Sequence, residues 1–135
     1  MWVVDTCVVL DILESDPEFG VASARCLQTH MTEGLVISPV TMVELSPAFD
    51  GNLAEQKYFL TSAGIVWDER WTTADTESAH IAWNACIQAK RSSKIRKRPV
   101  ADILIGAFAS GRQGLITRNP ADFSPWFPAL AILEP

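Results

Sequence analysis

Three acidic residues of this sequence, Asp5, Glu44 and Asp102, are expected to lie beside buried chain, because each is flanked by apolar residues. A carboxylate next to a hydrophobic core costs free energy unless it is hydrogen-bonded, paired with a cation or bound to a metal. Carboxylate oxygens suit Mg²⁺ or Mn²⁺, whereas zinc favours His or Cys. The three residues therefore predict a divalent-cation site. Taken alone, Asp102 is equally well explained as an ordinary first-turn acid of a helix.

The basic residues are unevenly distributed. The net charge of −5 argues against a nucleic-acid partner, yet six of the 11 Lys and Arg residues fall between positions 90 and 98. They are Lys90, Arg91, Lys94, Arg96, Lys97 and Arg98. A basic cluster close to an acidic pocket is what a phosphodiester hydrolase needs, with cations holding the nucleic-acid backbone and carboxylates holding a metal. The alternative is a solvated helix end whose cations complement the helix dipole.

Apolar segments and helical patterns alternate along the chain. Five apolar runs predict strands over residues 2–4, 35–37, 64–67, 114–117 and 130–133. Helices are predicted from Asp16-Pro17 to about Thr32, from Ser38-Pro39, and over residues 52–62, 73–91 and 99–110. Unbroken apolar runs are typical of parallel strands covered on both faces. The pattern predicts an α/β fold, a three-layer α/β/α sandwich around a parallel sheet of about five strands.

The carboxyl ends of parallel strands meet at one edge of the sheet, where such folds bind ligands. Asp5 ends the first predicted strand and Glu44 lies early in the helix after the second. The segment Thr117-Arg118-Asn119 ends the fourth predicted strand. We therefore expect these residues at one edge of the sheet. Small residues on the Asp102 face of its helix, such as Gly106, are expected to allow another stretch of backbone to approach closely.

Length and composition favour a globular protein with one domain spanning residues 1–135. No apolar run approaches the roughly 20 residues that span a bilayer, and the first residues lack the basic segment of a signal peptide. We expect no membrane association and a cytoplasmic location. Three cysteines without a C-x-x-C spacing argue against a disulfide framework and against a zinc site.

Four blocks of residues carry a resemblance to a known family. They are Val4-Asp5-Thr6, Thr41-x-x-Glu44, Pro99-x-x-Asp102-x-x-Ile105-Gly106-Ala107, and Leu115-Ile116-Thr117-Arg118-Asn119 followed by Asp122-Phe123. In this order and spacing, the blocks resemble the PIN-domain ribonucleases, and among them the VapC-type toxins of VapBC toxin–antitoxin pairs. The resemblance spans nearly the whole chain. It implies a PIN-like fold and a Mg²⁺- or Mn²⁺-dependent endoribonuclease that acts on RNA.

The resemblance also implies roles for individual residues. Asp5, Glu44 and Asp102 would be metal ligands, and Thr6 would support Asp5. The fourth acidic position of the family falls on the neutral Asn119, which is expected to weaken a second metal site more than the first. The resemblance further implies a homodimer and a cognate antitoxin protein as partners.

Other residues near these blocks have two explanations each. Arg118 would contact the RNA phosphate or neutralise the acidic cluster. Thr41 would hydrogen-bond Glu44 or its own helix start. Asp122 would complete the site or, as we favour, cap a turn after Asn119-Pro120.

Two other functions remain open from the sequence. An aspartyl-phosphate phosphatase also places an Asp after its first strand, but it generally needs a second Asp two residues later, where this chain has Cys7. The other is an RNA-binding module on the same fold that has weak or no catalytic activity, which the neutral Asn119 favours.

Overall fold

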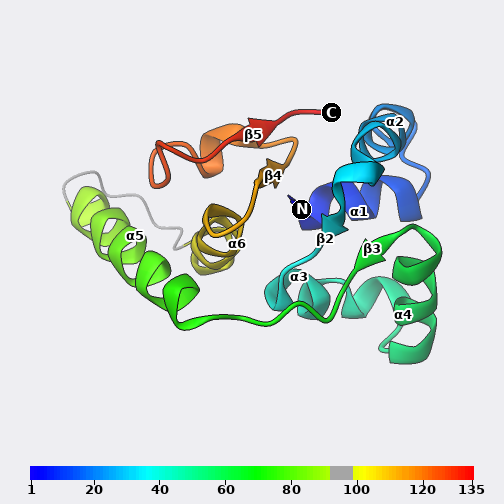
Figure 1. Ribbon diagram of the computed structural model, residues 1–135, viewed down its shortest axis with the longest axis horizontal. Helices are drawn as coiled ribbons and strands as arrows, with labels where there is room; N and C mark the ends of the chain where they lie inside the picture. Colours follow the sequence, from blue (N-terminus) through cyan, green and yellow to red (C-terminus); the bar gives the residue numbers. More distant parts are fainter. Residues whose placement is uncertain (92–98) are drawn as a thin grey trace.

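The computed structural model describes residues 1–91 and 99–135, and in this part of the chain six α-helices flank a sheet of five parallel strands (Figure 1). The strands are β1 (Trp2–Val4), β2 (Leu35–Val36), β3 (Ile65–Val66), β4 (Gly114–Ile116) and β5 (Ile132–Leu133). Their order across the sheet is β3-β2-β1-β4-β5. The predicted fold class, a three-layer α/β/α sandwich with a parallel sheet, is confirmed.

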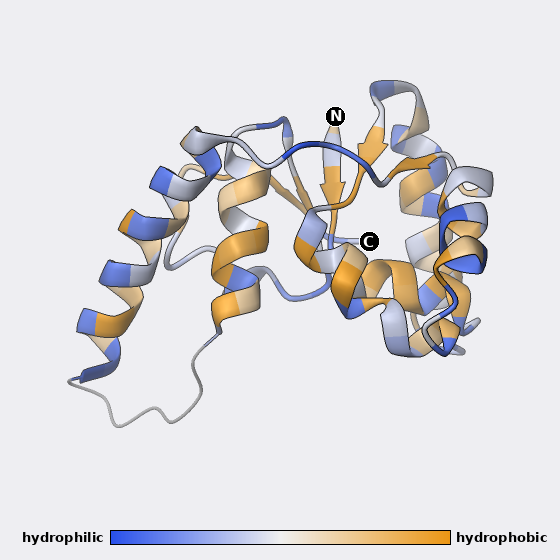
Figure 2. Cartoon of the chain, turned by 90° about the horizontal axis from the view of Figure 1, so that it is seen from below, coloured by the Kyte–Doolittle hydropathy of each residue, from blue (hydrophilic) through white to orange (hydrophobic). Residues whose placement is uncertain are grey.

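The helices lie in two groups on opposite faces of the sheet (Figure 1). They are α1 (Thr6–Leu13), α2 (Gly20–His30), α3 (Pro39–Glu44), α4 (Leu53–Ser62), α5 (Thr73–Arg91) and α6 (Val100–Ser110). The described residues also form three short 3-10 helices: η1 (Met31–Glu33), η2 (Ser46–Phe49) and η3 (Pro120–Asp122). Figure 2 shows apolar strands in the middle of the molecule and hydrophilic residues on the outer helix faces. Within the described ranges, no helix is long and apolar enough to cross a membrane.

The strand β1 shows how the two faces of the sheet are filled. Successive side chains of a strand point to opposite faces. Trp2 and Val4 pack with α1, α2 and α4 in one core, whereas Val3 packs with α6 in a second core. All three residues are buried, as is expected for a central strand covered on both sides. A third apolar cluster joins α6 to α5, which makes α5 the outer helix of its layer.

The start predicted for the helix at Asp16-Pro17 was wrong. The structure has α1 over Thr6–Leu13, a helix that the sequence analysis did not predict, and α2 begins only at Gly20. Asp16 caps a turn instead, because its carboxylate accepts hydrogen bonds from the backbone N–H groups of Glu18 (2.9 Å) and Phe19 (2.8 Å). These two bonds also lower the pKa of Asp16. A short apolar run after a strand does not reveal its helical period, which explains the missed helix.

The expected close approach at Gly106 exists, but the neighbour is a side chain and not backbone. A Cβ atom built on Gly106 would lie 2.3 Å from a ring carbon of Phe127. Glycine is therefore the residue that lets the segment after η3 pack on α6.

The predicted helices over 52–62, 73–91 and 99–110 agree with α4, α5 and α6 to within one residue.

Candidate functional site

The site lies at the carboxyl ends of β1 and β4, where the direction of chain progression across the sheet reverses. From β1 the chain moves outward to β2 and β3, and it then returns to form β4 on the other side of β1. Loops diverge at such a point and leave space for a ligand. Asp5 follows β1 and Thr117 follows β4, and the Thr117 hydroxyl donates a 2.6 Å hydrogen bond to Asp5 Oδ2. Topology therefore brings together residues that are distant in the sequence.

Asp5 is 7% exposed, and hydrogen-bond donors surround its carboxylate. It is the N-cap of α1, with Oδ1 accepting a 2.8 Å hydrogen bond from the backbone N–H of Thr6. The Cys7 thiol, 3.4 Å away, donates to Oδ2. Burial and the neighbouring Asp5 charge raise the pKa of Cys7 to about 11, so the thiol keeps its proton. These donors hold the Asp5 carboxylate in a fixed orientation at the N-terminal end of α1.

Thr6 links Asp5 to Glu44. Its backbone N–H donates a hydrogen bond to the Asp5 carboxylate, and its hydroxyl donates a 2.7 Å hydrogen bond to Glu44 Oε1. Glu44 is exposed and is the last residue of α3, not an early one as predicted, because this helix has only six residues. Thr41 lies one turn earlier, fully buried, and its Oγ1 is 3.2 Å from the Thr6 hydroxyl. Two carboxylates from different elements thus approach the same threonine.

The Ser38-Pro39 pair explains why α3 presents Glu44 at this edge. Ser38 follows β2 in extended conformation, and its side chain accepts a 3.1 Å hydrogen bond from the backbone N–H of Thr41. Proline is favoured at the first helical position, where no N–H donor is needed. The helix ends at Glu44 and is followed by η2, which contains Pro47. A short capped helix directly after a strand therefore fixes the position of Glu44.

Asp102 lies in the first turn of α6 and is partly buried. This helix packs against both β1 and α3, the elements that position Asp5 and Glu44. Among residues 1–91 and 99–135, however, no group of three or more His, Cys, Asp or Glu side chains is arranged to hold a metal ion. The oxygen donors fit a hard cation in their chemistry.

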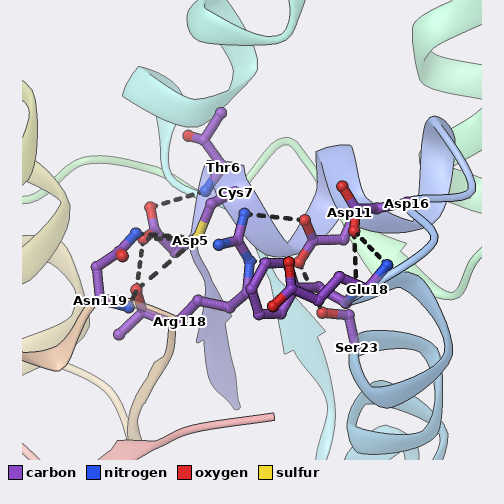
Figure 3. A network of polar contacts seen from close by, with 11 residues as sticks. Asp5, Thr6, Cys7, Asp11, Asp16, Glu18, Ser23, Arg118 and Asn119 are labelled. Carbon is purple, nitrogen blue, oxygen red and sulfur yellow. Dashed lines mark hydrogen bonds and ion pairs between the residues drawn. The ribbon is translucent and has the colours of Figure 1, made fainter.

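Arg118 is directed toward an acid that the sequence analysis did not identify. Its Nε donates to Asp11 Oδ2 at 2.6 Å and its Nη2 donates to Asp11 Oδ1 at 2.9 Å (Figure 3). Asp11 lies on α1, is 3% exposed, and also accepts a 2.8 Å hydrogen bond from the Ser23 hydroxyl of α2. The Arg118 guanidinium carbon lies 4.2 Å from the centre of the Phe19 ring. The hydrogen bonds with Asp11 raise the pKa of Arg118 further.

Asn119 and Asp122 have different positions relative to the site. The Asn119 backbone N–H donates to the Thr117 hydroxyl at 3.1 Å, and its side-chain nitrogen lies 3.8 Å from Cys7 Sγ. Asn119 therefore borders the site from the β4 side. Asp122 is exposed in η3, and its backbone N–H donates to Asn119 O at 3.0 Å. Both explanations of Asp122 stay predictions, because this bond involves only its backbone.

The proposed RNA-contacting residues Arg96, Lys97 and Arg98 lie outside the described residues, and their role stays a prediction. No protein-family model matches the chain, and no curated protein matches it significantly. The resemblance to the PIN-domain ribonucleases likewise stays a prediction.

Proposed function

We propose that the chain is a metal-dependent endoribonuclease of the PIN-domain type, the toxin of a VapBC-like toxin–antitoxin pair. The observation that carries the proposal is the convergence on Thr6. Its backbone N–H and its hydroxyl contact Asp5 and Glu44 at 2.8 and 2.7 Å, respectively. The contact lies at the reversal point of a parallel sheet, which is the usual ligand position in such folds.

In this proposal Asp5, Glu44 and Asp102 would hold Mg²⁺ or Mn²⁺. The ion would supply charge neutralisation at the phosphate and an activated water. Asp5 is held in place by Thr117, Thr6 and Cys7. Glu44 is exposed at the end of α3, and the Thr6 hydroxyl donates a hydrogen bond to its carboxylate. Asn119 borders the site, and its neutral amide would take the fourth position of the family's acidic set.

The alternative function is an RNA-binding module with weak or no catalysis. It is favoured by the finding that the described residues contain no assembled group of three metal ligands. The neutral Asn119 at the fourth position of the family's acidic set favours it as well. The two functions differ in metal binding and in catalysis, and both differences can be measured.

The partners of the proposed ribonuclease would be an RNA substrate, a cognate antitoxin and a second copy of the chain in a homodimer. The protein would act in the cytoplasm. The antitoxin and the homodimer follow from the resemblance alone.

The proposal is tested by incubating a panel of structured and single-stranded RNAs with the purified protein, in Mn²⁺, in Mg²⁺ and with chelator. Cleavage is expected only with metal. Asp102→Asn and Glu44→Gln are expected to lower the rate by about 100-fold or more, because loss of even an outer-sphere metal partner costs 10–100-fold. Mn²⁺ is also expected to raise the Tm of the wild type and not that of Asp102→Asn.

Glu55→Gln is the matched control for Glu44→Gln. Glu55 is exposed in the first turn of α4, and its replacement removes the same charge. We expect this variant to cleave RNA at the wild-type rate. RNA binding without cleavage, together with a Tm that is indifferent to Mn²⁺, would support the binding module and rule out the ribonuclease.

A further inference from the structure

The pair formed by Arg118 and Asp11 lies directly beside the proposed site. Arg118 follows Thr117, whose hydroxyl bonds Asp5, and its guanidinium lies between Cys7 and Asp11 (Figure 3). Both nitrogen contacts with Asp11 are short, at 2.6 and 2.9 Å, and they form the two-pronged arrangement that fixes a guanidinium in its plane. The side chain of Asp11 is 4% exposed and that of Arg118 is 25% exposed. One end of the pair is therefore buried, while the other reaches solvent.

The hydrogen-bonding capacity of Arg118 is not exhausted by Asp11. A guanidinium carries five N–H groups, and the contacts with Asp11 use two of them, which leaves three. Among the described residues, no hydrogen bond joins these three groups to another acceptor. A partly exposed, permanently charged group with donors to spare is suited to a phosphate oxygen.

Within the described residues, Arg118 pairs with Asp11 and not with Asp5. An arginine close to a buried carboxylate would normally approach it, because the pairing relieves the cost of the buried charge. In the described part of the chain, no hydrogen bond links Arg118 to Asp5, which instead accepts from Thr117, Thr6 and Cys7. Asp11 thus competes for Arg118 and leaves the Asp5 carboxylate to neutral donors.

The surroundings of Asp11 explain how it holds Arg118. The Ser23 hydroxyl donates to Asp11 Oδ2 at 2.8 Å, so that α2 fixes the carboxylate from the other side. Phe19 packs under the guanidinium at 4.2 Å. Residues of α1, α2 and the segment between them therefore orient one arginine of the β4 end.

We propose that Asp11 is a positioning residue, which holds Arg118 beside Asp5 rather than on it and presents its remaining N–H groups to a backbone phosphate of RNA. This inference rests on the proposed function for the identity of the ligand. It assigns to Asp11 a role that depends entirely on Arg118. It also means that the Asp5 carboxylate keeps its neutral hydrogen-bond donors while a positive charge remains close to the phosphate.

The test is equilibrium binding of a fluorescent single-stranded RNA to the full chain with chelator present, so that it does not depend on cleavage. Arg118→Gln is expected to weaken binding about tenfold, because charge-assisted hydrogen bonds are the strong ones. Asp11→Asn is expected to weaken it about threefold, although it removes a negative charge that repels RNA. The double variant is expected to bind no more weakly than Arg118→Gln, since Asp11 acts through Arg118.

The salt dependence of binding gives a readout that a structural role of Asp11 would leave unchanged. The slope of log K against log salt is negative, and loss of one phosphate contact on a single strand reduces its magnitude by about 0.7. We expect this reduction for Arg118→Gln and also for Asp11→Asn, which retains the arginine charge. In Mn²⁺, where the wild type cleaves RNA, both changes are expected to raise KM more than they lower kcat.

Two control variants distinguish the positioning role of Asp11 from an effect on folding and from an effect of charge alone. Glu14→Gln removes an acid at the end of α1, where Glu14 is exposed, and is expected to leave RNA affinity unchanged or slightly higher. Ser23→Ala removes the hydroxyl that supports Asp11 while leaving the contacts with Arg118, and is expected to lower Tm more than RNA affinity. If Asp11→Asn does not fold, Arg118→Lys replaces it, because lysine keeps the charge and loses the two-pronged contact.

The inference is overturned if Asp11→Asn binds RNA as tightly as the wild type, if its effect adds fully to that of Arg118→Gln, or if the wild type binds no RNA. Where Asp11→Asn does not fold, wild-type affinity of Arg118→Lys overturns it. Absence of metal-dependent cleavage, with the binding results as expected, would instead remove the ribonuclease and keep the role of Asp11.

Discussion

At the scale of single residues, Thr6 contacts two carboxylates, each through a different group. Its N–H belongs to the helix cap of α1 and its hydroxyl reaches Glu44 of α3. Removing the hydroxyl leaves the cap intact, since the cap needs the backbone alone. The two functions of Thr6 can therefore be separated by mutation.

We predict that Thr6→Val lowers the rate of metal-dependent RNA cleavage about tenfold, in the range found for partners of metal ligands. Stability is expected to change by about 1 kcal/mol, because the variant loses the bond to the exposed Glu44 and the bond to the buried Thr41 hydroxyl, which keeps Ser38 as a donor. Thr6→Ser keeps the hydroxyl and serves as the control, with nearly wild-type cleavage. Wild-type activity of Thr6→Val would show that the position of Glu44 does not depend on Thr6.

The residues of the site were predictable to different degrees. The positions of Asp5 and Glu44 followed from strand ends and a Ser-Pro helix start, which are local signals. Asp11 gave no such signal, because a lone acid between Leu10 and Ile12 looks like the polar position of a surface segment. Its partner Arg118 is 107 positions away in the sequence, and no local pattern reports such a contact.

At the scale of elements, α6 carries a close packing contact at Gly106 as well as the proposed ligand Asp102. The Phe127 ring lies directly on Gly106. The helix is also tied to α5 beyond its C-terminal end, where Arg112 Nη1 donates to Asp75 Oδ1 at 3.1 Å and to Phe108 O at 2.6 Å. Asp75 is 2% exposed, and burial of the pair makes it a specific attachment of α5 rather than a surface contact.

We predict that Gly106→Ala destabilises the protein by about 1–3 kcal/mol, as over-packing in a core does. Helix propensity alone would give the opposite sign, a gain of about 1 kcal/mol. The steric effect wins because the new Cβ would lie 2.3 Å from the ring of Phe127, which is itself 7% exposed and held in place. Urea unfolding measures the change.

Ser110→Ala is the control for this prediction, as a substitution at the exposed end of the same helix. It is expected to change stability by less than about 1 kcal/mol, because it removes one hydrogen bond to the Gly106 carbonyl. A Gly106→Ala protein that is more stable than the wild type would show that Phe127 can move away at little cost.

At the scale of the whole molecule, the carboxyl ends and the amino ends of the strands carry different groups of polar residues. The carboxyl edge carries the candidate site. At the amino edge, Glu33 joins the chain segments before β2 and β4 to the start of β1. It accepts hydrogen bonds from the Trp2 indole at 3.0 Å and from the Gln113 side chain, and lies 2.7 Å from His30 Nδ1. These contacts lower the pKa of Glu33 to about 2, mainly through His30 and Trp2.

We predict that Glu33→Gln changes the pH dependence of stability. The carboxyl pKa is lower in the folded state than its ordinary value of 4.5, so folding favours the ionised form. The stabilisation is present above about pH 4.5 and is lost as the pH falls toward 2. Tm should therefore be lower in Glu33→Gln than in the wild type at pH 6, and the difference should shrink by pH 2.5.

Gln113→Ala is the partial variant for this experiment, since it removes one donor and keeps the carboxyl group. It is expected to reduce the pH-dependent difference without abolishing it. Because Glu33 is exposed, added salt is expected to reduce the effect as well. Equal Tm differences at pH 6 and pH 2.5 would contradict the assigned role of Glu33.

The sequence by itself determined the class of fold and the approximate place of most elements. Apolar runs, Ser-Pro and Asn caps and the glycine after α6 are local signals that act within a few residues. Only the tertiary structure decided that Arg118 pairs with Asp11, that Phe127 lies on Gly106, and that Thr6 joins Asp5 to Glu44. The physical reason is that these contacts depend on the order of strands in the sheet, which brings distant segments together and leaves no periodic trace in the sequence.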